Sequence, residues 1–193
     1  MSIELFSKKG FNSVSIRDLA KEVGIKQSSL YNHFKSKDEI LEDIYEFFKA
    51  EAIKVFPQVE NLDDTIKKYT PKEFFKQGKK LFIQYMLSTR MEKIWRILFI
   101  EQASDQRAAN ILLHESFKKS LSFMEKALEK MIEQGKITSI NTRICAYEYI
   151  YPLNFMFFEY IISKSINADK NSLERQMDEH INYFCNIILE KKI

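Results

Sequence analysis

Apolar side chains recur every three or four residues along most of the chain, which is the spacing of one face of an α-helix. The clearest stripe is Ile40, Ile44, Phe48 and Ala52, in which each residue follows the last by four positions. Repeats of this kind predict helices near 2–9, 15–22, 26–33, 36–56, 61–68, 71–88, 90–103, 105–134, 141–165 and 172–191. The expected fold class is therefore all-α.

Several predicted helices begin and end with recognisable residues. A hydroxyl or amide side chain followed three residues later by a carboxylate can cap the first turn, and such starts lie at Ser15, Ser36, Thr70 and Asn171. Glycines suited to a left-handed closing position follow helical stretches at Gly10, Gly24 and Gly135. Pro152 lies inside the helix predicted over 141–165, where its missing amide should produce a kink.

Composition argues against a β-rich fold and against a membrane protein. The 193 residues include four glycines and three prolines, too few for the many tight turns of a sandwich or barrel. No apolar stretch approaches the roughly 20 residues of a membrane helix, and the first residues lack the order of a signal peptide. Two cysteines, Cys145 and Cys185, are too few for a disulfide framework. We therefore expect a cytoplasmic protein without a membrane partner.

Basic residues are concentrated at the start of the chain. The whole chain has 30 Lys and Arg against 27 Asp and Glu, whereas residues 1–37 hold seven basic and three acidic residues. The first segment therefore carries a net charge of +4 and the remainder −1. This distribution favours contact between the first segment and a polyanion, although surface lysines alone can produce a similar excess.

Residues 15–34 show the pattern of a helix-turn-helix. The first short helix has an apolar face made of Ile16, Leu19, Ala20 and Val23. Gly24 supplies a tight turn, and Leu30 and Phe34 of the second helix face inward. On the outer face of that second helix, side chains that can hydrogen-bond occupy an arc of roughly 140°. They are Gln27, Ser28, Tyr31, Asn32 and Lys35.

A narrow helix with such a polar face can enter the major groove of DNA. Amide side chains there read base edges, while hydroxyls and lysines bind phosphates. From this pattern alone, a small helical bundle without a DNA-binding role is the alternative.

The segment from Phe6 to Phe48 closely resembles the DNA-binding head of the tetracycline-repressor (TetR/AcrR) family of bacterial transcription regulators, above all in the run from Gly24 to Lys37. The resemblance implies a three-helix DNA-binding domain over 1–46 and a larger helical domain for effector binding and dimerisation over 47–193. Pattern and resemblance together give a set of DNA-contacting residues. They are Ser15, Arg17, Lys26, Gln27, Ser28, Ser29, Tyr31, Asn32, His33, Lys35 and Lys37.

The resemblance also implies a pocket for a small-molecule effector within the second domain. Aromatic and Met residues with a few polar neighbours would suit a hydrophobic effector, whereas plain core packing is the alternative for each of them. The candidate pocket residues are Phe82, Tyr85, Met86, Trp95, Phe99, Glu101, His114, Phe117, Tyr151 and Phe155.

The last predicted helix repeats apolar residues at 4-3-4 spacing, which suits a seam with a partner helix. These residues are Met177, Ile181, Phe184 and Ile188. The resemblance implies dimerisation through the last two helices, and packing within one chain is the alternative. A two-fold dimer would place two recognition helices about 34–36 Å apart on a pseudo-palindromic operator.

The function expected from these features is that of a ligand-responsive transcriptional repressor. It would bind double-stranded operator DNA as a homodimer and be released by the effector. The alternative is a helical ligand-binding module whose head no longer reads DNA. An enzyme is not expected, because the chain has no Glu-x-x-His pair, no HExxH motif and no phosphate-loop glycines. No metal or cofactor is predicted, and the operator, the effector, the regulated genes and a redox role of either cysteine stay open.

Overall fold

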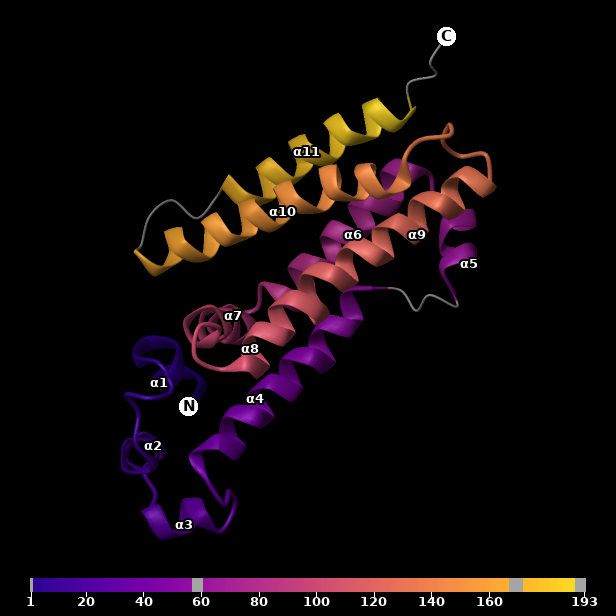
Figure 1. Ribbon diagram of the computed structural model, residues 1–193. Coiled ribbons are helices and arrows are strands. Elements are labelled where there is room, and N and C mark those ends of the chain that lie inside the picture. The colour runs from indigo at the N-terminus through magenta and orange to yellow at the C-terminus, as the bar shows by residue number, and fades with distance from the viewer. Residues whose placement is uncertain (1, 57–60, 167–171, 190–193) are drawn as a thin grey trace. The chain divides into compact units, whose positions relative to one another are not determined.

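The computed structural model describes residues 2–56, 61–166 and 172–189, and these form helices without a strand (Figure 1). The predicted all-α class is confirmed. Within the same residues, no helix is long and apolar enough to cross a membrane.

The chain packs into two compact units. Unit 1 comprises Met1–Ile53 and Tyr85–Ser116, and unit 2 comprises Lys54–Gln84 and Phe117–Ile193. The predicted division by function into 1–46 and 47–193 stays a prediction. The division by packing differs from it because residues 85–116 share a core with the first helices.

Unit 1 is built from the N-terminal helices and two later ones. They are α1 (Ser2–Lys9), α2 (Ile16–Val23), α3 (Gln27–Tyr31), α4 (Lys37–Ala52), α7 (Thr89–Glu101) and α8 (Gln106–Asn110). Helix α7 packs against α1, α4 and α8. Its core includes the edge-on pair of Phe48 and Trp95, with ring centroids 4.7 Å apart.

Unit 2 is a bundle of the remaining helices. They are α5 (Leu62–Lys68), α6 (Pro71–Met86, as far as Gln84), α9 (Lys119–Glu133), α10 (Thr142–Ser165) and α11 (Ser172–Leu189). Helix α10 packs against both α9 and α11, as Figure 1 shows. At the centre, Phe75, Tyr149 and Phe184 form an aromatic triad with centroid separations of 4.7, 5.5 and 5.0 Å.

The predicted helix starts are confirmed at two places and partly at a third. Ser15 and Asp18 form a reciprocal capping box at α2, and hydrogen bonds from the Ser15 hydroxyl and backbone lower the pKa of Asp18. Thr70 and Glu73 form the same arrangement at α6. Ser36 accepts from the amide of Glu39, whose carboxylate turns instead to the amide of Lys35. The start predicted at Asn171 lies outside the described residues.

The predicted closing glycines are also confirmed. Gly10, Gly24 and Gly135 have φ of 75°, 76° and 67°. Helix α10 continues across Pro152, and the kink expected there stays a prediction.

Two predicted helices have different bounds in the structure. The helix expected over 105–134 is divided into α8, a π-helix over Ile111–Lys118, and α9. Periodic spacing cannot reveal a π-helix, because the extra residue in each turn depends on local packing. The helix expected over 26–33 is limited to α3, since the carbonyl of Leu30 accepts from both His33 and Phe34 and tightens the chain after Tyr31.

The seam predicted for a partner helix is buried within a single chain. Met177, Ile181, Phe184 and Ile188 of α11 are each at most 3% exposed within a single chain. Ile181, Phe184 and Ile188 belong to the core of unit 2. A 4-3-4 spacing shows that one face of a helix is buried, but it does not show against which chain.

Candidate nucleic-acid interface

Helices α2 and α3 are joined by a turn that needs a glycine. Gly24 has φ of 76°, and its amide hydrogen-bonds to the carbonyl of Lys21 at 3.2 Å. The amide of Ile25 then reaches the carbonyl of Ala20 at 3.0 Å. These bonds satisfy the last carbonyls of α2 in the manner of a left-handed C-cap, which a side chain at position 24 would strain. The turn therefore sets the direction in which α3 leaves α2.

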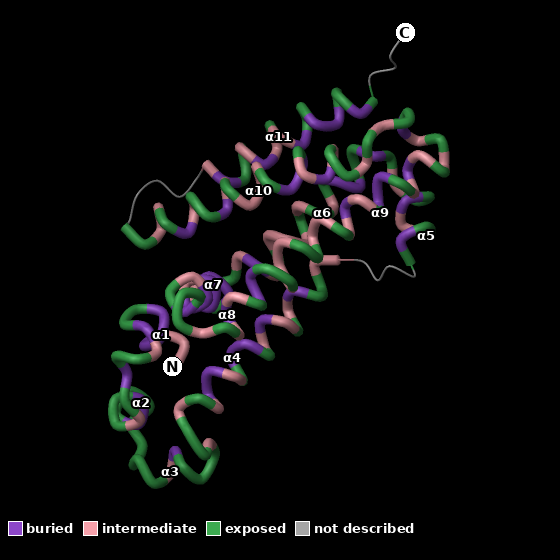
Figure 2. The backbone as a smooth tube through the Cα atoms, in the orientation of Figure 1, coloured by how far each residue is buried: buried purple, intermediate pink, exposed green. Residues whose placement is uncertain are grey.

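Helix α3 has one buried residue, and most of its other side chains are exposed to solvent. Leu30 is 7% exposed and is its buried residue, whereas Tyr31 is 48% exposed. The side chains of Lys26, Gln27, Ser28, Asn32, His33 and Lys35 are also exposed, and Ser29 is half-buried. Figure 2 shows this exposure along α3 and the segment that follows it. The structure thus gathers the predicted groove-facing residues on one short exposed segment.

Two of the predicted DNA-contacting residues lie at the start of α2. Ser15 and Arg17 are both exposed. The Ser15 hydroxyl accepts from the amide of Asp18 at 3.1 Å, so it is part of the cap. The capped first turn of α2 presents a partial positive charge to an anion.

Lys37, one of the predicted DNA-contacting residues, has a structural role in the head. Its Nζ donates to the carbonyls of Phe11 and Val14, each at 2.7 Å, and lies 4.0 Å from the centroid of the Phe11 ring. The ammonium therefore ties the segment between α1 and α2 to the start of α4.

Glu101 supports the same segment from α7. Its side chain is buried, at 4% exposure, and its Oε1 accepts from the amide of Phe11 at 2.7 Å. A Cβ at Gly10 would lie 3.4 Å from this oxygen, so the carboxylate packs closely against the backbone. Glu101 was predicted to be a polar group of an effector pocket, and the structure instead uses it to hold the head.

A charged network at the start of α4 was missed by sequence reasoning. Arg107 donates to Asp38 at 2.7 Å, to Glu42 at 2.9 Å and to Asp105 at 2.9 Å. Burial alone would raise the pKa of Asp105, but hydrogen bonds from Arg107 hold it below its usual value. Tyr45 donates to Asp105 at 3.3 Å. No local motif indicates this network, because its members on α4 lie 60 to 69 positions along the chain from their partners Asp105 and Arg107.

Comparison with known proteins agrees with this geometry. A family described as "Bacterial regulatory proteins, tetR family" matches residues 2–44, which span α1, α2, α3 and the first half of α4. Residues 2–44 therefore form a tetR-family head.

Two curated relatives match part of this chain. It is 34% identical over 76 residues to the uncharacterized HTH-type transcriptional regulator YerO of Bacillus subtilis, covering 39% of this chain and 25% of YerO. It is 51% identical over 41 residues to IcaR of Staphylococcus aureus, named as the negative transcriptional regulator of the biofilm operon icaADBC, covering 21% of this chain and 22% of IcaR. The chain thus spans about a quarter of the length of these relatives.

Solved structures share the whole fold. A tetR-family transcriptional regulator from Mesorhizobium loti has a TM-score of 0.63 at 15% identity, covering 96% of this chain and 92% of that one. PfmR from Thermus thermophilus has a TM-score of 0.61 at 19% identity, covering 98% and 97%. At these identities, the likeness is one of fold.

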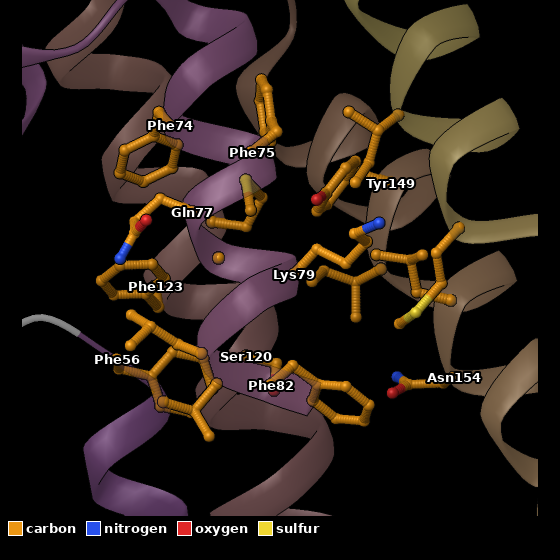
Figure 3. A pocket seen from close by; sticks show the side chains of 18 of the residues that line it. Phe56, Phe74, Phe75, Gln77, Lys79, Phe82, Ser120, Phe123, Tyr149 and Asn154 are labelled. Carbon is orange, nitrogen blue, oxygen red and sulfur yellow. The ribbon is translucent and has the colours of Figure 1, made fainter. Parts of the chain in front are cut away.

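The second site is a cavity of about 130 Å³ within unit 2 (Figure 3). Side chains from α5, α6, α9, α10 and α11 line it, and most are apolar. The apolar lining includes Phe56, Phe74, Phe75, Phe82, Phe123, Met124, Tyr149, Ile150, Leu153, Met177 and Ile181. The polar lining includes Thr65, Gln77, Lys79, Ser120 and Asn154.

The predicted pocket residues match this cavity at one position, Phe82. Met86, Trp95 and Glu101 are buried in unit 1, and His114, Tyr151 and Phe155 are exposed. The remaining predicted residues, Tyr85, Phe99 and Phe117, are half-buried and do not line it. Nine of the ten predicted residues do not line this cavity, because apolar residues at helical spacing indicate burial, but only packing between helices leaves a void.

Two observations in the described residues concern metal and thiol chemistry. No group of three or more His, Cys, Asp or Glu side chains there is placed to hold a metal ion. Burial raises the pKa of the Cys145 and Cys185 thiols, which disfavours the reactive thiolate form.

Proposed function

We propose that this protein is a transcriptional repressor that binds an operator as a homodimer and is released by a small apolar effector. One observation carries the proposal: a capped, glycine-closed helix-turn-helix exposes the polar residues of α3, within the segment that matches the tetR family. The named function of IcaR, a negative transcriptional regulator, supports repression. Because its partner would be chromosomal DNA, the protein would act in the cytoplasm.

The exposed residues on α3 and directly after it divide by chemistry into two roles. Gln27 and Asn32 have amide side chains that can bond to both polar atoms of an adenine edge in the major groove. Tyr31, His33 and Lys35 can donate to phosphate oxygens, and Arg17 at the start of α2 can do so on the other side of the groove. The first role gives sequence preference, and the second gives most of the affinity.

The outer face of α10 supports dimerisation. Tyr151, Phe155, Phe158 and Ile162 are 53, 69, 40 and 46% exposed and follow one another at 4-3-4 spacing, so they form one apolar stripe. On the neighbouring α11, Tyr183 and Ile187 are also exposed. Contiguous apolar surface of this kind is costly to leave in water. We propose that a second copy of the chain covers it, in place of the buried seam that the sequence predicted.

A dimer with this interface makes a prediction about Phe155. Replacing Phe155 with serine should weaken the dimer by about tenfold or more, because each copy contributes the ring to the same two-fold contact. Sedimentation equilibrium at micromolar concentration measures the change. Leu113→Ser removes an equally apolar, exposed side chain outside the stripe and should leave the dimer unchanged. An unaltered association of the Phe155 variant would rule out this face.

The DNA-binding role predicts that the affinity for DNA falls steeply as the salt concentration rises. If each head places two cationic side chains on phosphates, a dimer neutralises about four phosphates. Raising salt from 50 to 200 mM should then weaken binding to DNA from its own promoter region about 100-fold. Fluorescence anisotropy with labelled DNA measures the slope. Binding that is absent, or insensitive to salt, would favour the alternative of a ligand-binding module that does not read DNA.

The effector would release DNA by lowering the fraction of dimers that can bind the operator. A ligand that binds unit 2 more tightly when the two heads are not spaced for the operator lowers the fraction of dimers able to bind DNA. The cavity of unit 2 is the proposed effector site, since five helices contribute to its wall and most of the lining side chains are apolar.

A further inference from the structure

The wall of the cavity in unit 2 includes one buried hydrogen-bond donor that has no acceptor among the described residues. The Nδ2 atom of Asn154, on α10, is buried and makes no hydrogen bond within the described protein. Asn154 lines the cavity, and Figure 3 shows its amide group directed toward the space beside Phe82. A buried donor left unpaired is unfavourable, and its hydrogen-bonding capacity is available to a bound molecule.

The charged residue of the cavity wall is already neutralised. Lys79 of α6 lies 2.6 Å from the carboxylate of Asp178 on α11, and its side chain is 15% exposed. An anionic ligand would have to displace Asp178 from this pair. A cationic ligand would find the carboxylate already occupied by Lys79. The lining therefore favours a molecule without net charge.

The volume of the cavity suits a small occupant. Apolar cavities of about 150 Å³ hold one benzene molecule, and this one has about 130 Å³. Aromatic rings from α6 and α9, such as Phe82 and Phe123, form much of its wall and can pack against a ring. A single ring with a short substituent is the matching shape.

We infer that the effector is a small uncharged molecule of one apolar ring with a carbonyl-type acceptor, which accepts a hydrogen bond from Asn154 Nδ2. This inference rests on the proposed function only in calling the ligand an effector. Its chemistry follows from the unpaired amide, the neutralised lysine and the size of the cavity.

Two isosteric probes test the hydrogen bond. Acetophenone carries the carbonyl acceptor, and isopropylbenzene has nearly the same shape without it. We expect the full-length protein to bind acetophenone about tenfold more tightly in isothermal titration calorimetry, because only acetophenone pairs the buried donor. Equal affinity for the two probes, or binding of neither, would overturn the inference. This comparison needs no variant.

A substitution at Asn154 identifies the donor. Asn154→Leu should remove the preference for acetophenone by strengthening isopropylbenzene and weakening acetophenone. Asn110→Leu changes an exposed asparagine of α8 and should preserve the preference. A preference that survives in the Asn154 variant would show that another group makes the bond.

Charged analogues test the neutrality of the site. Benzoate and benzylamine should each bind at least about tenfold more weakly than acetophenone, because Lys79 and Asp178 already satisfy one another. Tightest binding by benzoate would show that Lys79 recognises an anion and would overturn the inference.

Release of DNA is measured separately, by anisotropy of a preformed protein–DNA complex. Asn154-dependent binding of acetophenone without release of DNA would support the inferred ligand chemistry and count against the regulatory role of the cavity. The failure of the inference and the failure of the proposed function are thus distinguishable.

Discussion

Replacing Gln27 and Asn32 with alanine is expected to weaken operator binding about 1,000-fold, with little effect on DNA of unrelated sequence. Both side chains are exposed on or next to α3, and neither supports the fold of the head. A dimer would present four such amides to bases. At the lower bound of about 1 kcal/mol for each base contact, their loss sums to about 4 kcal/mol. Phosphate contacts remain, so affinity for unrelated DNA should persist.

The measurement is anisotropy with operator and scrambled DNA at one fixed salt concentration. Gln106→Ala combined with Asn110→Ala removes the same two side chains from exposed positions of α8, in the same unit. This control should bind the operator as the parent protein does. An equal loss of affinity for operator and scrambled DNA in the α3 variant would show that Gln27 and Asn32 do not read bases.

Replacing Glu101 with alanine is expected to lower the free energy of unfolding of unit 1 by about 2–4 kcal/mol. The substitution leaves the amide of Phe11 without its 2.7 Å partner and opens a void at a site that is 4% exposed. An unpaired buried amide costs about 1–3 kcal/mol, and the lost packing adds to that cost. Because Gly10 approaches the same carboxylate, the link between α1 and α2 should loosen first.

The single tryptophan makes this measurement specific. Trp95 lies on α7 in unit 1, so its fluorescence during urea unfolding reports on that unit. Glu101→Gln keeps an acceptor for the amide of Phe11 and should cost about 1 kcal/mol. Glu129→Ala removes an exposed carboxylate from α9 and should change stability by less than about 0.5 kcal/mol. Identical unfolding of the Glu101→Ala and parent proteins would show that the contact is not stabilising.

The local features of the fold could be predicted from the sequence because their causes lie within a few residues. Ser15 and Asp18 are three positions apart and cap α2 as predicted. Gly24 closes α2 in the left-handed conformation that its position indicated. The exposed polar positions of α3 also follow from one helical turn, given that Leu30 is the residue that anchors it.

The predictions that differ from the structure share a physical cause, as Trp95 and Ile181 illustrate. Both were recognised as apolar residues on a helical face, and both are buried. Trp95 packs on Phe48 in unit 1 and does not line the cavity, whereas Ile181 lines the cavity and does not face a partner chain. Periodicity identifies the buried face of a helix, but it does not specify the element that covers that face.

By itself, the sequence determined the all-α class, the capped and glycine-closed helix-turn-helix and the polar residues that α3 exposes. Each of these depends on hydrogen bonds and spacing within one or two turns of helix. Only the tertiary structure decided that Glu101 and Lys37 hold the head, that the last helix buries its regular seam in its own unit, and that Asn154 faces a cavity. Those outcomes depend on contacts between segments far apart in the chain, and such contacts leave no local pattern.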